Sequence, residues 1–254
     1  MEKREQIRKW FEGTNLAGYW FPTILCSLMI LVLLNSLITD YGNLKNPSVA
    51  ILVIVACLIP HYLLYNKYKQ IGNLPSEVQL DQWLEEDIQS VIKDRPYDKL
   101  GVLKEDLVAE SLLVVGPIFW NISGFSQEDI LTKKGKDGFN RYTTWTIQVF
   151  AFTENYLCSY KCHYNWLKNT YINESTNEFF YKDVVSVKTD TISSAYTLMN
   201  GQRLVHSEAF QLKLAGDEIT VITNDASLNT SSVMVSKAEK AVQSIRAMLR
   251  DKKK

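Results

Sequence analysis

Two apolar stretches near the N-terminus decide the architecture of this 254-residue chain. The first is AGYWFPTILCSLMILVLLNSLI (17–38), and the second is SVAILVIVACLIPHYLLY (48–65). At ~1.5 Å of rise per residue, the first reaches just past the ~30 Å hydrocarbon core of a bilayer, and the second is at the short end of a span. Asp40 and Lys45, both in the turn between the stretches, are the only formal charges from residue 17 to 65. Two such stretches in succession favour a transmembrane hairpin over a buried core helix, so the lipid bilayer is the first expected partner.

Lysine and arginine counts near the ends of the stretches predict the orientation of the hairpin. The cations that precede the first stretch or follow the second are Lys3, Arg4, Arg8, Lys9, Lys67 and Lys69. The turn between the stretches holds only Lys45. We therefore expect a multi-pass protein with both termini in the cytoplasm. The short chain and the lack of targeting signals suit a bacterial inner (plasma) membrane.

Few polar residues interrupt the two stretches. Asn35 either hydrogen-bonds between helices, which favours a homo-oligomer, or lies at the interface and bonds to water and headgroups. Pro60 is expected to kink the second helix. His61 is either an intramembrane titrating group or an interfacial residue, because it precedes Asn66 by only five positions.

Residues 66–254 have the composition of a soluble domain, with 23 Lys/Arg against 24 Asp/Glu. This neutral balance gives no strong nucleic-acid footprint. Cys26 and Cys57 lie in the apolar stretches, and Cys158 and Cys162 lie four apart in a predicted strand. This is not the dense cysteine framework of a small secreted domain, so we expect reduced thiols.

The pattern of residues 66–254 changes from helical to β along the chain. Ser76 begins a capping box, and apolar residues at helical spacing predict a helix over 76–93. Residues 107–120 are ambiguous, since LVAESLLVV reads as helix and Gly116-Pro117 as a strand entry. A polar loop is predicted over 167–177, and a helix from 235 precedes a basic tail at 250–254. The predicted strands cover 142–152, 156–166, 178–187, 202–206, 209–215 and 218–223.

These patterns predict a membrane α-helical hairpin followed by a cytoplasmic α+β domain, with a small antiparallel β-barrel or sheet and a C-terminal helix. The predicted segments are a cytoplasmic tail (1–16), the transmembrane hairpin (17–65), a linker (66–75), a helical segment (76–119) and a β domain with its C-terminal helix (120–254).

The β domain resembles bacterial pleckstrin-homology (PH) and GRAM-like domains over roughly residues 120–250. The resemblance lies in the strand order and in the segments FAFTENYLCSY, FFYKDVVSVKT and FQLKLAGDEITVIT, followed by the last helix. A closed barrel of another kind fits nearly as well. The resemblance implies that the loop after the first strand presents cations to phosphorylated headgroups. The candidate ligand- or phosphate-binding residues are therefore Lys133, Lys134, Lys136 and Arg141, with a solvated hairpin turn as the alternative.

No sequence motif points to catalysis. The chain lacks the serine-hydrolase elbow, the zinc-protease helix, the Walker loop and the dinucleotide glycine fingerprint. Cys158, Cys162 and His163 form the only Cys/His cluster, and no second cysteine pair completes a zinc site. We therefore expect neither an enzyme, nor a metal, nor a cofactor.

In layout, the chain resembles the two-span effectors of bacterial antiphage systems, of the retron-associated or cyclic-oligonucleotide-activated type. That resemblance implies a cytoplasmic domain that senses a nucleotide or protein signal. It also implies a hairpin that oligomerises and perturbs membrane integrity, in antiviral defence by abortive infection. The nine-residue outer turn is too short to bind a ligand, which favours this hypothesis. The alternative is a membrane-tethered PH-like adaptor that binds lipid headgroups or a protein partner.

Overall fold

The computed structural model describes residues 2–13, 16–39, 47–72, 74–192, 196–197, 203–204, 207–216, 218–225 and 232–252. The chain divides into two compact units. One consists of Arg8–Pro75, and we call it the hairpin unit. The other combines Met1–Ile7 with Ser76–Lys254, and we call it the sheet unit.

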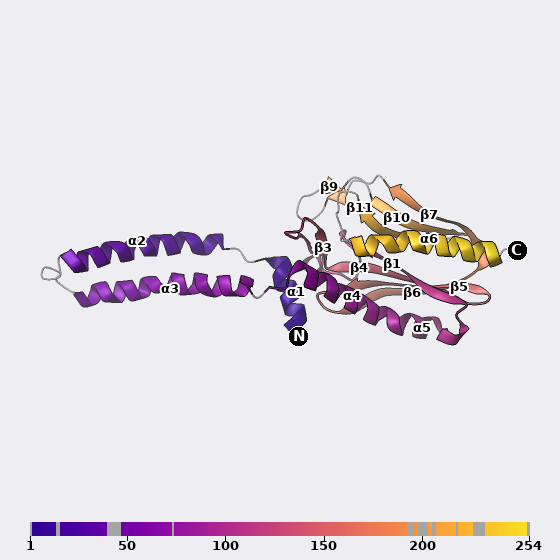
Figure 1. Cartoon of the computed structure of the whole chain (residues 1–254), viewed down its shortest axis with the longest axis horizontal. Helices are drawn as coiled ribbons and strands as arrows, with labels where there is room; N and C mark the ends of the chain where they lie inside the picture. The colour runs from indigo at the N-terminus through magenta and orange to yellow at the C-terminus, as the bar shows by residue number, and fades with distance from the viewer. Residues whose placement is uncertain are drawn as a thin grey trace. The chain divides into compact units, whose positions relative to one another are not determined.

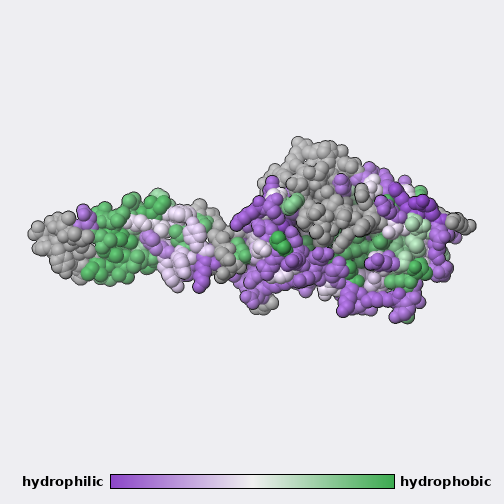
Figure 2. Space-filling model, viewed as in Figure 1, coloured by the Kyte–Doolittle hydropathy of each residue, from purple (hydrophilic) through white to green (hydrophobic). Residues whose placement is uncertain are grey.

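The hairpin unit contains α2 (Ala17–Thr39) and α3 (Pro47–Gly72), which run side by side in opposite directions (Figure 1). The windows Gly18–Asn35 and Ile51–Lys69 are long and apolar enough to cross a membrane. Only 6% and 11% of these windows are buried, unlike the core helices of a soluble protein. Hydrophobic side chains cover much of the visible surface of this pair (Figure 2). The predicted pair of apolar helices is confirmed.

The sheet unit contains two main antiparallel sheets. The four-stranded sheet has the order β1 (Ala109–Pro117), β4 (Thr144–Phe152), β5 (Tyr156–Asn165) and β6 (Thr170–Phe180). The three-stranded sheet has the order β11 (Glu218–Asp225), β10 (Ser207–Leu214) and β7 (Val184–Ile192). The described residues also form two short strand pairs, β2 (Thr132–Lys134) with β3 (Asn140–Tyr142) and β8 (Tyr196–Thr197) with β9 (Arg203–Leu204). Among the described strands, hydrogen bonds form these separate sheets and no closed barrel.

The four-stranded sheet is covered by helices on both faces. On one face, Val242 and Ile245 of α6 (Ser232–Lys252) share a buried cluster with Phe150, Leu157 and Phe210. Side chains alternate along a strand, so Tyr160 of β5 faces the other side from Leu157. That side carries α4 (Glu77–Lys93) and α5 (Arg95–Leu100) (Figure 1). The expected sheet-rich domain with a C-terminal helix is therefore confirmed.

Local sequence sets the ends of the helices on this second face. Ser76 is the N-cap of α4, as predicted, and its side chain accepts a hydrogen bond from the Gln79 N–H at 3.2 Å. Gly101 ends α5 with a φ of +66°, a left-handed value that glycine adopts readily. In the described part of the chain, three 3-10 turns connect the elements, η1 (Lys104–Asp106), η2 (Gln127–Asp129) and η3 (Tyr181–Asp183).

Two N-terminal segments differ from their predicted boundaries. Residues 1–16 were expected as a tail, but Glu2–Glu12 form helix α1, in which Ile7, Trp10 and Phe11 are buried at helical spacing. Residues 66–75 were expected as a linker, but α3 continues to Gly72. No helix breaker stands between Asn66 and Gly72, so the helix extends beyond its apolar part.

Further along the chain, strand pairing corrects the predicted pattern. The segment 76–119 is helical only in its first part, because Ala109–Pro117 form β1 and pair with β4. The predicted loop 167–177 belongs largely to β6, a polar strand at the edge of its sheet. The predicted strand 178–187 is divided by η3 into β6 and β7. Residues 202, 205 and 206 of another predicted strand lie outside the described residues, and so do 253 and 254 of the basic tail.

Candidate functional site

The predicted basic turn forms a β-hairpin of β2 and β3, residues 132–142, within the connection from β1 to β4. We call it the basic hairpin. Gly138 in its turn has a φ of +86°, which glycine adopts without strain. Lys134 and Lys136 are exposed, and Lys133 is half-buried. Burial lowers the pKa of Lys133, and the charge of Glu77 opposes that effect. The basic hairpin therefore presents two exposed ammonium groups.

Arg141, the fourth predicted residue, is buried and ion-paired. Its side chain is 6% exposed, and its guanidinium donates to both carboxylate oxygens of Asp81 at 2.8 Å. It also donates to Asp137 at 2.6 and 3.1 Å. Burial alone would lower the pKa of Arg141, but the two carboxylates outweigh it and raise that pKa. The Arg141 hydrogen bonds hold the pKa of Asp137 below its usual value. This geometry gives Arg141 the role of holding the basic hairpin on α4.

A second contact fixes the basic hairpin to the first turn of α4. The backbone N–H of Lys136 donates to Glu77 at 3.2 Å. Gly135 has no room for a side chain, because a Cβ there would collide with Arg141 and Asp137. The basic hairpin is thus a supported structure whose exposed lysines can attract an anion while Arg141 maintains its position.

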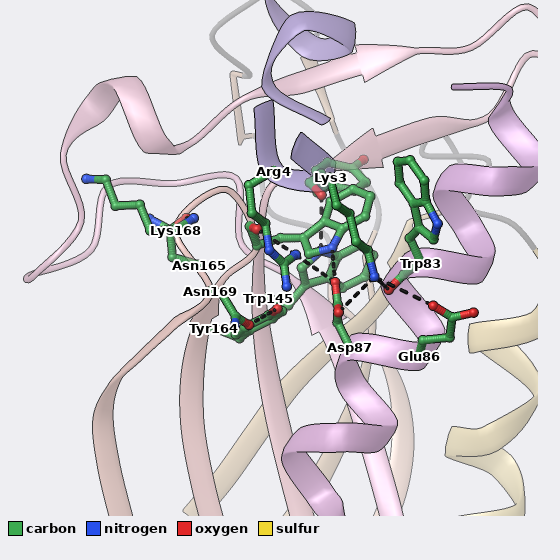
Figure 3. A network of polar contacts seen from close by, with 12 residues as sticks. Lys3, Arg4, Trp83, Glu86, Asp87, Trp145, Tyr164, Asn165, Lys168 and Asn169 are labelled. Carbon is green, nitrogen blue, oxygen red and sulfur yellow. Dashed lines mark hydrogen bonds and ion pairs between the residues drawn. The ribbon is translucent and has the colours of Figure 1, made fainter. Parts of the chain in front are cut away.

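A separate polar cluster surrounds Asp87 of α4, whose side chain is 14% exposed (Figure 3). Asp87 accepts hydrogen bonds from Arg4 at 2.6 Å, from Lys3 at 3.0 Å and from the indole N–H of Trp166 at 2.8 Å. Arg4 also donates to the backbone carbonyl of Trp166 at 3.1 Å. We call these four residues the Asp87 cluster.

The Asp87 cluster joins residues that precede the apolar helices in sequence to residues that follow them. Lys3 and Arg4 precede α2, whereas Asp87 and Trp166 follow α3. Sequence reasoning used Lys3 and Arg4 only for membrane orientation, and no local pattern pairs them with Asp87. The sequence separation of 83 residues between Arg4 and Asp87 explains the omission.

A third cluster ties α5 to the edge strand β6. Arg95 forms an ion pair with Glu174 and lies over the ring of Tyr171, 4.7 Å from its centre. The hydroxyl of Tyr160 donates to Glu174 at 3.2 Å. The Arg95 hydrogen bond is the main cause that lowers the pKa of Glu174, while burial raises the pKa of Tyr160. The charged groups of Arg95 and Glu174 pair with each other, so we assign this cluster a structural role.

The hairpin unit also has internal polar contacts. His61 of α3 lies 2.8 Å from the Ser27 hydroxyl of α2, measured from Nε2 to Oγ. Thr23 and Cys57 are buried between the helices. Asn35, the predicted association residue, is exposed near the other end of α2 and makes a further interaction of its own.

The Cys158, Cys162 and His163 cluster takes the form of ordinary strand residues. Both cysteines are free and buried, and burial raises the pKa of each thiol to about 11. Burial also lowers the pKa of His163 to about 4, with Lys161 adding to the effect. Among the described residues, no group of His, Cys, Asp and Glu side chains has the arrangement of a metal site.

Comparison with protein-family models, with curated proteins and with solved structures gives no match for this chain.

Proposed function

We propose that this chain is a membrane-anchored binding module of a bacterial inner membrane, with both termini in the cytoplasm. The α2–α3 hairpin serves as the anchor, and the basic hairpin binds anionic lipid headgroups. The observation that carries this proposal is the attachment of the basic hairpin to the start of α4, through Lys136 with Glu77 and Arg141 with Asp81. Glu77 follows the last residue of α3 by five positions, so a short connection links the apolar helix to this surface.

The side chains of α2 and α3 favour an anchor over the wall of a pore. Large hydrophobic residues are exposed along both helices, among them Leu31, Val32, Leu52 and Ile59. The polar side chain of Ser27 faces His61 within the pair. A helix pair that exposes apolar side chains to lipid and forms hydrogen bonds between its two helices is stable in a bilayer without further helices.

The strand order of the sheet unit supports a PH-like assignment for its fold. A four-stranded antiparallel meander (β1, β4, β5, β6) precedes a three-stranded one (β7, β10, β11), and one helix follows. The basic hairpin is an insertion between the first two strands of the first meander. This is the loop in which the sequence resemblance places headgroup-binding cations.

The electrostatic contribution of the basic hairpin suits a module that is already anchored. Each lysine near an anionic leaflet contributes about 1 kcal/mol, so Lys134 and Lys136 together contribute about 2 kcal/mol. That is too little to recruit a free protein. It is enough to orient a domain that its anchor keeps at the membrane, because tethering makes the second contact intramolecular.

Lysine acylation of the full chain in nanodiscs tests this proposal. We expect Lys134 and Lys136 to react several-fold more slowly in anionic than in neutral nanodiscs, because headgroups cover their ammonium groups. Lys213, exposed on β10, is the internal control and should react equally in both. Equal rates for all three lysines in both lipids would contradict headgroup binding.

A second candidate is the two-span effector, and the Asp87 cluster favours it. In sequence, Lys3 and Arg4 precede the α2–α3 hairpin and Asp87 follows it, and all three side chains belong to one cluster. A signal that opened this cluster would release both ends of the hairpin together. The effector hypothesis therefore expects loss of membrane integrity when the cluster is broken, whereas the anchored module does not.

A further inference from the structure

An exposed apolar residue lies at the start of α4, where the basic hairpin is attached. Val78, the second residue of α4, is 66% exposed. Its neighbour Glu77 accepts the hydrogen bond from the Lys136 backbone N–H, and a Cβ on Gly135 would lie 3.0 Å from Glu77 Cγ. Val78 therefore lies beside the attachment of the basic hairpin.

The geometry of α4 explains why Val78 is exposed. Each residue of an α-helix is turned by about 100° from the one before it. Glu77 and Asp81, four residues apart, both bond to the basic hairpin and so share one side of α4. The buried side of α4 consists of Leu80, Leu84, Ile88 and Val91. Val78 lies about 60° beyond Asp81 around the helix axis, turned away from the buried side, and is therefore left outside the core of the sheet unit.

The groups around Val78 combine an apolar surface with exposed cations. Three carboxylates are engaged by groups of the basic hairpin, Glu77 by the Lys136 N–H and both Asp81 and Asp137 by Arg141. Lys134 and Lys136 are exposed, as Val78 is. An exposed apolar residue beside cations is typical of surfaces that lie in the membrane interface, where the cations meet anionic headgroups and the apolar group leaves water.

The place of Val78 in the chain indicates which partner this surface meets. A single exposed valine is ordinary on a protein surface and indicates nothing by itself. Here, however, Glu77 follows Gly72, the last residue of α3, by five positions, which span at most about 18 Å. The bilayer that α3 is proposed to cross is therefore within reach of Val78. It offers anionic headgroups to the lysines and an apolar layer to the valine.

We propose that Val78 and the exposed lysines of the basic hairpin form one membrane-contact surface, in which Val78 enters the headgroup layer of an anionic bilayer. The inference rests on the proposed headgroup binding and adds a hydrophobic contact to it. Lys134 and Lys136 supply an attraction that salt screens, whereas the contact of Val78 does not depend on charge. The two contributions together hold the start of α4 against the membrane.

Nitroxide labelling of the full chain in nanodiscs tests this contact. Val78→Cys and Leu103→Cys are labelled in separate chains, because Leu103 is 65% exposed and so matches Val78 in exposure. Within the sheet unit, α4 and α5 lead from Val78 to Leu103 (Figure 1), and α4 alone is about 25 Å long. Leu103 therefore serves as a control away from the basic hairpin. The unchanged chain, treated with the same label, gives the signal of the native cysteines, of which Cys57, Cys158 and Cys162 are buried.

The measured quantity is the ratio of two collision rates of the nitroxide, with oxygen, which dissolves in lipid, and with a nickel chelate, which stays in water. In nanodiscs of phosphatidylcholine and phosphatidylglycerol, we expect this ratio to be several-fold higher for the label at position 78 than for the label at position 103. Equal ratios at the two positions would overturn the inference. Because both side chains are exposed, neither replacement removes core packing.

Acylation of Lys134 and Lys136 in the same nanodiscs separates the two possible failures. Protected lysines together with a water-exposed label at position 78 overturn the hydrophobic contact alone, and headgroup binding stands. Unprotected lysines overturn headgroup binding and, with it, this inference, whatever the label reports. Protected lysines together with a lipid-exposed label at position 78 support both.

Discussion

Replacing Asp87 with asparagine removes one negative charge from the centre of the Asp87 cluster without changing the size of the side chain. The asparagine oxygen can still accept the hydrogen bond from the Trp166 indole, which lies 2.8 Å from the present carboxylate. Arg4, now 2.6 Å from Asp87, loses this counter-charge, and Lys3, now 3.0 Å from Asp87, keeps only the exposed carboxylate of Glu86 at 3.6 Å. The perturbation therefore acts on the attachment of α1 to α4 and leaves the packing in place.

The expected magnitude follows from the exposure of the three side chains. Asp87 and Arg4 are 14% and 22% exposed, so their charged hydrogen bond contributes about 1.5–3 kcal/mol. Lys3 is 31% exposed, and its pair adds only about 0–1 kcal/mol. We expect Asp87→Asn to lower the free energy of unfolding of the sheet unit by about 2 kcal/mol. For a domain of this size the midpoint of thermal unfolding then falls by about 4–8 °C.

Thermal denaturation and limited trypsin digestion of the full chain measure this effect. Loss of about 2 kcal/mol raises the population of the opened N-terminal helix by up to about 30-fold, so cleavage within α1 should accelerate accordingly. The matched control is Glu86→Gln. Glu86 lies 3.6 Å from Lys3 but is 68% exposed, and its replacement should have an effect below about 0.5 kcal/mol. Equal melting and cleavage of Asp87→Asn and the unchanged chain would refute the reasoning.

Substitutions at three further positions probe the sheet unit. Burial lowers the pKa of His163 to about 4 from an ordinary 6.5, so the unfolded chain binds its proton first. Stability is therefore lost as pH falls from 6.5 to 4, by at most about 3 kcal/mol. His163→Gln should flatten urea-derived stability over that interval, and an unchanged slope would reject this assignment. Arg141→Lys replaces a fork that contacts two carboxylates, and we expect a loss of about 2–3 kcal/mol in chemical denaturation. A neutral result would show that the basic hairpin does not depend on Arg141. Gly138→Ala meets no neighbour but forces a side chain into a φ of +86°, and should cost about 1 kcal/mol in melting experiments. Gly138→Asn should cost less, and the reverse order would contradict a conformational origin.

Local patterns were sufficient for the elements whose apolar residues follow one another directly or alternate regularly. The unbroken apolar stretch 17–38 predicted α2 and the alternation in 142–152 predicted β4, because both signals depend only on neighbours in sequence. β6 was missed because an edge strand with one exposed side has a polar composition, which is also typical of a loop. α1 was missed because Ile7, Trp10 and Phe11 stand among charged residues.

The candidate sites were predictable only in part, for a different physical reason. The basic hairpin could be found because its lysines and its Asp-Gly turn are adjacent in sequence. The pairing of Arg141 with Asp81 joins residues 60 apart, and the pairing of His61 with Ser27 joins residues 34 apart. No periodicity encodes such pairs, since they depend on how the folded elements meet. Sequence analysis therefore identified cations as candidate ligands without showing which one already had partners.

Induced expression in a bacterium, with membrane potential and propidium uptake recorded, tests the central claim of an anchored module most directly. The full chain is compared with its Asp87→Asn variant, in which the Asp87 cluster is weakened. The account predicts that both chains are recovered in the membrane fraction while the membrane stays polarised and excludes propidium. Depolarisation or propidium uptake, stronger in Asp87→Asn than in the unchanged chain, would contradict it and favour the two-span effector.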